Sequence, residues 1–198
     1  MKLVLASGNP GKLREIGALL APLGITLVAQ SQLGIVETDE PHDSFRGNAL
    51  AKARHASRAS GLPALADDSG ICVDALGGAP GVQSARYAGE PRSDARNNEK
   101  LLQELKNSRD RKAHYACVIA LARNAEDPDP LLAEGVWHGE IALAPRGSGG
   151  FGYDPLFWLP DRGLTAAELD LAEKNRISHR AVALSRLLGF LRKNPKFF

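Results

Sequence analysis

The chain has 198 residues, of which 43% are hydrophobic and 24% are charged, and its formal net charge is +2. This composition is typical of a soluble globular protein that buries a core without disulfides or a structural metal. The small net charge argues against nucleic acid or an anionic membrane as a partner, because binding to either uses a strongly basic surface. Any site for an anion must therefore be local.

The two cysteines, Cys72 and Cys117, are far apart and lie in no CxxC motif. We expect two buried thiols in a reducing compartment. The apolar run from Leu3 to Ala6 is too short for a signal peptide, and no later run reaches the length of a membrane span. The sequence therefore predicts a cytoplasmic protein with no membrane partner.

The first third of the chain alternates between short apolar runs and helical patterns. In chain order, the expected elements are a strand at residues 3–6, a helix from near Lys12 to before Pro22, a strand at 25–29, an acidic loop at 31–43 and a helix at 44–60.

The rest of the chain carries longer strand patterns. The expected elements are a strand at 64–66, a turn at 67–70, a helix from a Ser93 cap to about 105, strands at 115–123 and 131–143 with a break near Gly139, a capping box at 165–168 and a last helix after Ser178. This order predicts an α/β fold, with a mixed twisted sheet, flanking helices and two lobes around a central substrate cleft. Since no repeat or linker divides the sequence, we expect one domain over residues 1–198.

A polar segment, Ser-Gly-Asn-Pro-Gly-Lys at residues 7–12, follows the first predicted strand and opens the first predicted helix. The N-terminus of a helix offers unpaired N–H groups and partial positive charge to an anion, and Lys12 adds a full charge. The segment is not a Walker A loop, because Ala6 replaces its first glycine and Leu13 replaces its Ser or Thr. It predicts a phosphate site, although a Gly-Pro turn with an exposed lysine explains the same residues.

Asp67 and Asp68 end the apolar run that follows the second helix. Neighbouring strand residues point to opposite faces, so a turn at Ser69 would be needed to bring both carboxylates to one site. Carboxylates suit Mg²⁺, and one of them could instead act as a general base on water. A solvated turn is the alternative. The acidic loop, with Glu37, Asp39 and Glu40, could supply a further ligand, but a solvated charged loop is the simpler explanation.

A glycine-rich segment at residues 147–154 combines flexible backbone with Phe151, Tyr153 and a terminal carboxylate. Aromatic rings beside mobile backbone suit stacking on a nucleobase. The alternative is a hairpin with two core aromatic residues. Further on, Lys174 and the Ser-His-Arg sequence at 178–180 gather positive and hydrogen-bonding groups near the start of the last helix, where ordinary capping and surface charge are the alternative.

Four segments carry a likeness to a known family by their order and spacing: SGNPGK, ADDSGICVDALGGAPGVQSARYAG, GGFGYDPLF and EKNRISHRAVAL. From Lys2 to about Leu191, the sequence resembles the inosine triphosphate pyrophosphatase family. The resemblance implies a homodimeric α/β enzyme that depends on Mg²⁺, for which Mn²⁺ can substitute. It also implies hydrolysis of the non-standard purine nucleotides ITP, dITP and XTP to the monophosphate and pyrophosphate.

The same resemblance implies roles for the matching residues. Asp68 would accept the proton of the attacking water, and Lys12 would act with it in catalysis. Asp68, Asp67 and Glu40 would hold the metal, with Asp39 as the alternative to Glu40. The implied substrate-binding residues, among which Phe151 would stack on the base, are Ser7, Gly8, Asn9, Pro10, Gly11, Lys12, Lys52, Ser69, Phe151, Gly152, Tyr153, Asp154, Lys174, His179 and Arg180.

Three other interpretations compete with this one. A related pyrophosphatase for pyrimidine or methylated nucleotides is disfavoured by Phe151 and by the His179-Arg180 pair. A catalytically silent nucleotide-binding module is disfavoured by the presence of Asp67, Asp68 and Lys12. A nucleic-acid-binding protein is disfavoured because the basic residues form no clear stripe.

Overall fold

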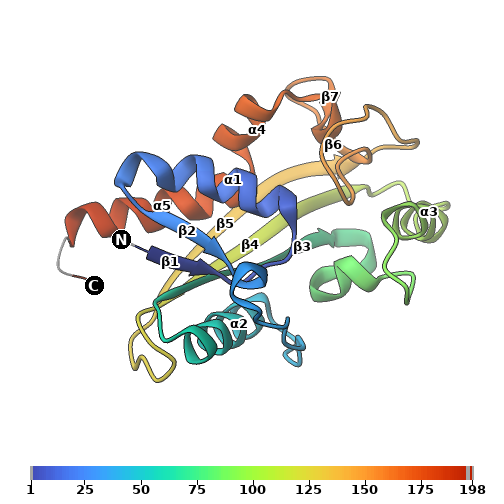
Figure 1. The fold of residues 1–198 in the computed structure, drawn as a ribbon. Helices are drawn as coiled ribbons and strands as arrows, with labels where there is room; N and C mark the ends of the chain where they lie inside the picture. The colour runs from blue at the N-terminus through green and yellow to red at the C-terminus, as the bar shows by residue number, and fades with distance from the viewer. Residues whose placement is uncertain (1, 195–196, 198) are drawn as a thin grey trace. The chain divides into compact units, whose positions relative to one another are not determined.

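The computed structural model describes residues 2–194 and 197 (Figure 1). The strands in this part of the chain are β1 (Lys2–Leu5), β2 (Thr26–Ala29), β3 (Ala64–Val73), β4 (Lys112–Ala122), β5 (Leu131–Ile141), β6 (Phe157–Leu159) and β7 (Leu164–Thr165). They form one sheet in the order β2-β1-β3-β4-β5-β6-β7. Strand β1 pairs in parallel with β2 and β3, whereas β6 pairs antiparallel with β5 and β7, so the sheet is mixed.

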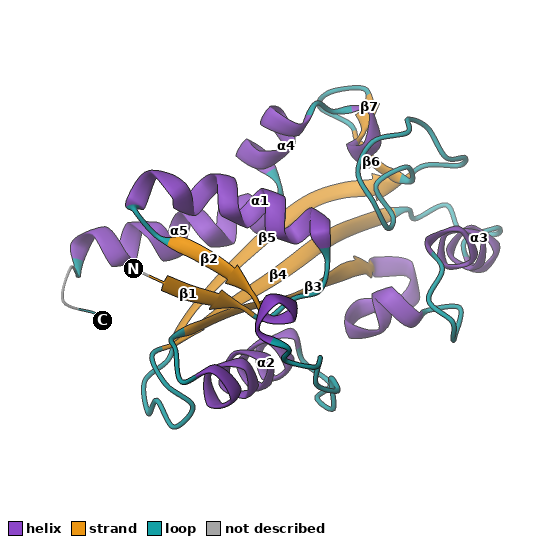
Figure 2. Cartoon of the chain, viewed as in Figure 1, coloured by secondary structure: helices purple, strands orange, loops and turns teal. Residues whose placement is uncertain are grey.

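The α-helices of the described residues are α1 (Pro10–Leu20), α2 (Phe45–Ser60), α3 (Asp94–Glu104), α4 (Leu171–Ile177) and α5 (His179–Lys193) (Figure 2). Helices α1 to α4 each begin after a residue whose side chain accepts a backbone N–H of the first turn, namely Asn9, Ser44, Ser93 and Asp170. None of these five helices combines the length and apolar character that crossing a membrane requires.

The chain divides into two compact units. Unit 1 consists of Met1–Asp68, Cys117–Gly135 and Val182–Phe198, and unit 2 consists of Ser69–Ala116 and Val136–Ala181. Strands β3, β4 and β5 and helix α5 supply residues to both units. Each unit has a hydrophobic core of its own.

The core of unit 1 explains why its strands are continuous apolar runs. Leu3 and Leu5 of β1 pack with α1 and α5, whereas Val4 and Ala6 pack with the alanine-rich face of α2. Because successive side chains of a strand point to opposite faces, α1 and α2 cover opposite faces of β1 (Figure 2). A strand covered on both faces needs an apolar residue at every position.

The core of unit 2 is richer in aromatic residues. The ring of Tyr115 in β4 lies 4.6 Å from that of Phe157 in β6, centroid to centroid, and Trp137 in β5 lies 5.1 Å from Phe157. Leu101 and Leu105, at the end of α3, are fully buried in the same cluster. This core positions the strands and loops that carry the candidate site residues of unit 2.

The predicted α/β class with a mixed sheet is confirmed, as are the expected strands and helices up to residue 60 within a few residues of their ends. The short strand at 64–66 is wrong in its extent, because β3 continues through the expected turn to Val73. The reason is position in the sheet: β3 extends past its pairing with β1, which covers Ala64 and Leu65, and lies beside the long strand β4. Pairing with that strand overrides the local turn preference of Ser-Gly.

The break expected near Gly139 is also wrong, because β5 is continuous from Leu131 to Ile141. A Cβ atom on Gly139 would lie 2.6 Å from the carbonyl oxygen of Trp158 and 2.8 Å from the ring of Phe157. The absence of a side chain at Gly139 therefore lets β6 pack closely against β5, and the glycine does not interrupt the strand. Helix α4 and the short strands β6 and β7 were not predicted.

Candidate active site

In unit 1, the Ser-Gly-Asn-Pro-Gly-Lys segment builds the N-terminus of α1. Asn9 is the cap residue, and its Oδ1 accepts hydrogen bonds from the N–H of Gly11 at 2.8 Å and of Lys12 at 3.3 Å. Ser7 Oγ accepts a hydrogen bond from the N–H of Asn9 at 3.1 Å. Pro10 takes the first helical position, where no N–H is needed. The helix begins at Pro10, two residues before the predicted start.

The N–H of Gly8 is directed at negative charge. It donates to Oε1 of Glu37, on the acidic loop, at 2.9 Å. The same loop is held to α2 by Val36, whose carbonyl oxygen lies 3.0 Å from Nε2 of His55. An N–H group that donates to a carboxylate oxygen at this position can also donate to a phosphate oxygen.

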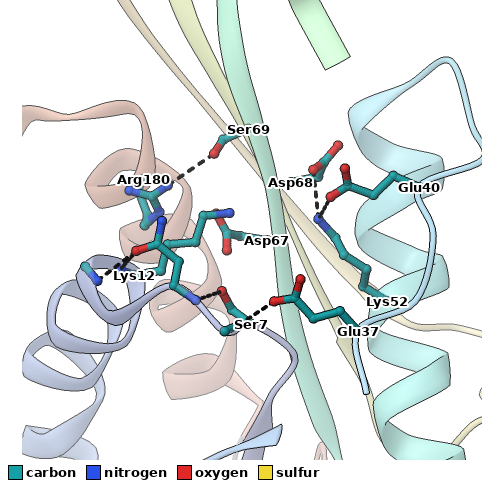
Figure 3. Close-up of polar contacts among 12 residues, drawn as sticks. Ser7, Lys12, Glu37, Glu40, Lys52, Asp67, Asp68, Ser69 and Arg180 are labelled. Atoms are coloured by element: carbon teal, nitrogen blue, oxygen red, sulfur yellow. Dashed lines mark hydrogen bonds and ion pairs between the residues drawn. The ribbon is translucent and has the colours of Figure 1, made fainter. Parts of the chain in front are cut away.

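Asp67 and Asp68 each lie beside a lysine of unit 1 (Figure 3). Oδ2 of Asp67 lies 3.0 Å from Nζ of Lys12 in α1, and Oδ1 of Asp68 lies 2.8 Å from Nζ of Lys52 in α2. Since α1 and α2 cover opposite faces of the strands, the two carboxylates keep the alternation of the core residues before them. The predicted turn that would bring them to one face is therefore absent, and each carboxylate has its own cation.

Lys52 joins two carboxylates, because its Nζ lies 2.8 Å from Glu40 Oε1 as well as from Asp68. Asp68 is 6% exposed, and none of the described residues forms a hydrogen bond with its Oδ2. Burial raises the pKa of Asp68, and the negative charge of Glu40 raises it further. The positive charges of Lys52 and Lys12 act in the opposite direction but do not cancel the increase. Burial lowers the pKa of Lys52, but attraction by Asp68, Asp67 and Glu40 outweighs it, so that pKa is raised.

In unit 2, Asp154 is the centre of a buried polar cluster. Its Oδ2 accepts hydrogen bonds from Nζ of Lys174 at 2.6 Å and from the N–H of Phe151 at 2.9 Å, and its Oδ1 accepts one from the hydroxyl of Tyr115 at 3.4 Å. Gly150 lets the chain pass this carboxylate, because a Cβ there would lie 2.0 Å from Asp154 Oδ2 and its φ is +71°. Asp154 therefore fixes the loop that carries Phe151.

His179 begins α5 and is 5% exposed. Its imidazole stacks on the ring of Tyr115, with 4.6 Å between centroids and 9° between planes. Burial raises the pKa of Tyr115 well above its ordinary value, and the charge of Asp154 adds to the effect. Tyr115 is therefore a neutral donor that touches both Asp154 and His179.

Two cations lie near the ring of Phe151. Nζ of Lys174 is 4.7 Å from the ring centroid, and the guanidinium carbon of Arg180 is 5.8 Å from it. Arg180 is 2% exposed and donates from Nη2 to Oγ of Ser69 at 3.1 Å (Figure 3). An aromatic ring beside buried donors is a surface that can recognise a planar, polar ligand.

The predicted site residues therefore form two groups. Unit 1 holds Ser7, Gly8, Asn9, Pro10, Gly11, Lys12, Glu40, Lys52, Asp67 and Asp68, and unit 2 holds Ser69, Phe151, Gly152, Tyr153, Asp154, Lys174, His179 and Arg180. Of the three carboxylates predicted to hold a metal, Glu40 and Asp68 share Lys52. Among the side chains that the structure describes, no group of three or more His, Cys, Asp or Glu residues is suited to a metal.

Two details differ from the simplest expectation. Tyr153 is 4% exposed and its hydroxyl donates to the carbonyl oxygen of Ser84 at 2.8 Å, so its ring supports the core of unit 2. Tyr115 is not predicted as a site residue from the sequence. The alternation along β4 predicts only that it is buried, and nothing in the sequence links it to a carboxylate 39 residues later.

Comparison of the sequence and the fold with those of known proteins identifies the class to which this α/β protein belongs. The chain belongs to the Ham1 family, whose model matches residues 3–190. Two solved Ham1 structures are similar to it. The protein from Coxiella burnetii has a TM-score of 0.92 at 49% identity, covering 98% of this chain and 99% of that one, and the protein from Staphylococcus aureus has a TM-score of 0.87 at 38% identity with the same coverage.

Sequence relatives narrow the class further. The chain is 64% identical over 193 residues to the protein named dITP/XTP pyrophosphatase of Nitrosomonas europaea, covering 98% of this chain and 95% of that protein. It is 63% identical to the protein of the same name in Ralstonia nicotianae, covering 96% of each. The family predicted from the four sequence segments is confirmed.

Proposed function

We propose that this protein hydrolyses the non-standard purine nucleoside triphosphates ITP, dITP and XTP to the monophosphate and pyrophosphate. One observation carries the proposal: 64% identity, over 98% of the chain, to a protein named dITP/XTP pyrophosphatase. The two clusters support it, because unit 1 offers a proton-accepting carboxylate beside lysines and unit 2 offers an aromatic ring beside buried donors.

We assign proton transfer to Asp68. A buried carboxylate with a raised pKa is a better base than an ordinary aspartate, and Lys52 orients it through Oδ1. Water would lose its proton to Asp68 while its oxygen bonds to the α-phosphorus, and the bond from that phosphorus to the bridging oxygen would break. Lys12 and the positive end of α1 would then stabilise the charge of the departing pyrophosphate.

We assign the cofactor Mg²⁺, which Mn²⁺ can replace, to Asp68 and Glu40, which share Lys52. Asp67, the third carboxylate predicted from the sequence, lies on the opposite face of β3 beside Lys12 and is left out of this pair. The donors fit, because all are carboxylate oxygens and Oδ2 of Asp68 is buried without a hydrogen bond from any described residue. When bound, Mg²⁺ would neutralise phosphate charge that otherwise repels the attacking water. Glu40 is favoured over Asp39, because Glu40 is bonded to Lys52 whereas Asp39 is exposed.

We assign the phosphates to residues 7–12 with Lys52 and Ser69, and the base and sugar to the cluster of unit 2. In that cluster, Phe151 would stack on the base. The buried donors suit a base with a 6-oxo group, since the 6-amino group of adenine would leave a donor facing a donor. The residues concerned are Gly152, Asp154, Lys174, His179 and Arg180, whereas Tyr153 supports the core of unit 2.

The assignment to purine editing is tested with a panel of nucleotides. We expect kcat/KM for ITP and XTP to exceed that for ATP at least about a hundredfold, because a mismatched polar edge leaves buried groups unpaired. Comparable turnover of ATP would contradict this selectivity while leaving the family assignment intact. Turnover of pyrimidine nucleotides at the same rate would favour the competing pyrophosphatase class.

The bond that breaks is tested in H₂¹⁸O. Attack at the α-phosphate of ITP should place the label in IMP and leave pyrophosphate unlabelled. Label in pyrophosphate would show attack at the β-phosphate, and release of IDP with orthophosphate would place the protein in another hydrolase class.

We further propose that the protein is a cytoplasmic homodimer. Light scattering on the purified protein should then give twice the chain mass of 21.1 kDa. A mass equal to one chain at micromolar concentration would contradict the dimer without bearing on the chemistry.

A further inference from the structure

Helix α3 of unit 2 has no part in the function proposed above, yet its first two turns hold one residue of the glycine-rich loop. The N–H of Gly152 donates to Oδ2 of Asp94 at 2.7 Å, and the carbonyl oxygen of Gly152 accepts from Nδ2 of Asn98 at 2.9 Å. Asp94 and Asn98 are four residues apart, so they lie on the same side of the helix. Both polar groups of a single glycine are thereby bound to one helix.

The residue held in this way follows Phe151 directly. Gly152 has a φ of +62°, a conformation that other residues rarely adopt. On the N-terminal side of Phe151, its own N–H donates to Oδ2 of Asp154 at 2.9 Å. The main chain on both sides of Phe151 is therefore fixed by side chains, although the segment contains too many glycines to hold its own shape.

The amide of Asn98 has one further property. Its Oδ1 is buried, and none of the described residues bonds to it. Interior helix positions favour alanine over asparagine, so helix formation alone does not explain Asn98. The bond to Gly152 is a specific reason for an amide at this position.

We propose that Asp94 and Asn98 are positioning residues for the base: they hold Gly152 so that the ring of Phe151 is preorganised for stacking. This inference rests on the proposed function, in which Phe151 stacks on the purine. Loss of either hydrogen bond frees a glycine-rich loop that the ligand must then order again, which weakens binding without changing the chemistry at the phosphate.

The test compares four single variants by steady-state kinetics with ITP. Asp94→Ala and Asn98→Ala should each raise KM about three- to tenfold, the range expected for one lost hydrogen bond, with kcat within about twofold of wild type. Asp94→Asn should keep KM within about twofold, because the amide oxygen can accept the same bond. A purely electrostatic effect of Asp94 would make the asparagine and alanine variants alike.

Ser93→Ala is the matched control. It removes the cap of the same helix, a bond from the N–H of Arg96 to Ser93 Oγ at 3.3 Å, without touching Gly152. Its thermal stability should fall, while KM for ITP stays at the wild-type value. An increase in KM as large as that of Asp94→Ala would show that only helix stability matters, and would overturn the proposal.

Inorganic tripolyphosphate separates the base from the phosphates. Its inhibition constant should be unchanged in Asp94→Ala and Asn98→Ala, because it has no base to stack. An equal loss of tripolyphosphate and ITP binding would overturn the inference. An unchanged KM for ITP in Asn98→Ala would also overturn it. If Asp94→Ala does not fold, the KM of Asn98→Ala alone decides. Failure of the wild-type protein to hydrolyse ITP would instead refute the proposed function.

Discussion

Each of the two clusters of the candidate site contains a buried carboxylate, and the two carboxylates differ in how many hydrogen bonds they accept. Asp154 in unit 2 accepts three hydrogen bonds, and both of its oxygens are used. Asp68 in unit 1 is almost as buried, yet no described residue bonds to its Oδ2, and burial raises its pKa. A fully bonded carboxylate holds its neighbours in place, whereas one with an unused oxygen can take up a proton or a cation.

This difference assigns different kinetic roles to the two clusters. Changes around Asp68 should act on the chemical step and therefore on kcat. Changes around Asp154 should act on ligand binding and selectivity, and therefore on KM.

Removal of divalent metal should abolish activity. EDTA should reduce the rate to background, and millimolar Mg²⁺ should restore it, because so few protein carboxylates bind Mg²⁺ weakly without the nucleotide. Glu40→Gln should raise the Mg²⁺ concentration needed for half-maximal rate. Full activity in EDTA, or tightly bound zinc in the purified protein, would contradict the assignment of a hard cation to these oxygens.

Asp68→Asn should lower kcat by about 10² to 10⁴ with a small change in KM, since it removes a proton acceptor and keeps the shape. The matched variant is Asp154→Asn, which should mainly raise KM because it weakens the bond to Lys174 and loosens the Phe151 loop. Measurement of both constants with ITP decides between them. If both variants lose only kcat, the two clusters do not divide the work as proposed.

The pH dependence of kcat/KM should follow the charge around Asp68. Because burial raises the pKa of Asp68 above its ordinary value of 3.8, the acid limb of the profile should lie above that pH. Lys52 lowers this pKa, so Lys52→Gln should move the limb to higher pH. A limb that stays in place in Lys52→Gln would show that another group controls the rate in acid.

Much of the fold could be predicted because its elements have strong local patterns. The Ser93 cap and the Ala-rich helix at residues 44–60 are visible in the sequence and occur in the structure. The exceptions are β3 and Gly139, where the neighbouring strands decide. Pairing carries β3 through a Ser-Gly turn pattern, and a close approach of β6 requires glycine within a strand.

The candidate site could be predicted in its residues but not in its contacts. Asp67 and Asp68 looked like one pair of carboxylates, whereas each is bonded to a different lysine. The role of Tyr115 depends on which loop reaches it, and that is a property of the packed core of unit 2. Chemistry-bearing residue types are visible in a sequence, but their partners are set by the fold.

The smallest expected effect concerns stability, and it contrasts two buried carboxylates of unit 1. Asp127 is fully buried and forms two close bonds with Arg123, at 3.0 Å and 2.5 Å. These bonds, with backbone donors, lower its pKa from 3.8 to about 2, although burial opposes them. Its bonds therefore stabilise the fold above pH 3.8, and this contribution is lost as the pH falls through about 2. The raised pKa of Asp68 has the opposite sign: its ionisation is unfavourable to the fold, and the penalty appears as the pH rises through that pKa.

Replacement by asparagine should therefore act in opposite directions at the two positions. At pH 7, Asp127→Asn should lower the free energy of unfolding by about 1–2 kcal/mol, after allowance for the solvent around the guanidinium, and the deficit should shrink as the pH falls toward 2. Asp68→Asn should unfold at a higher urea concentration than wild type at pH 7, and the gain should disappear near pH 3 because wild-type Asp68 is then protonated. Urea unfolding of the three proteins at both pH values measures the two differences. A destabilised Asp68→Asn at pH 7 would mean that Lys52 outweighs burial at this carboxylate, and Asp68 would then resemble Asp127 as a structural ion-pair partner.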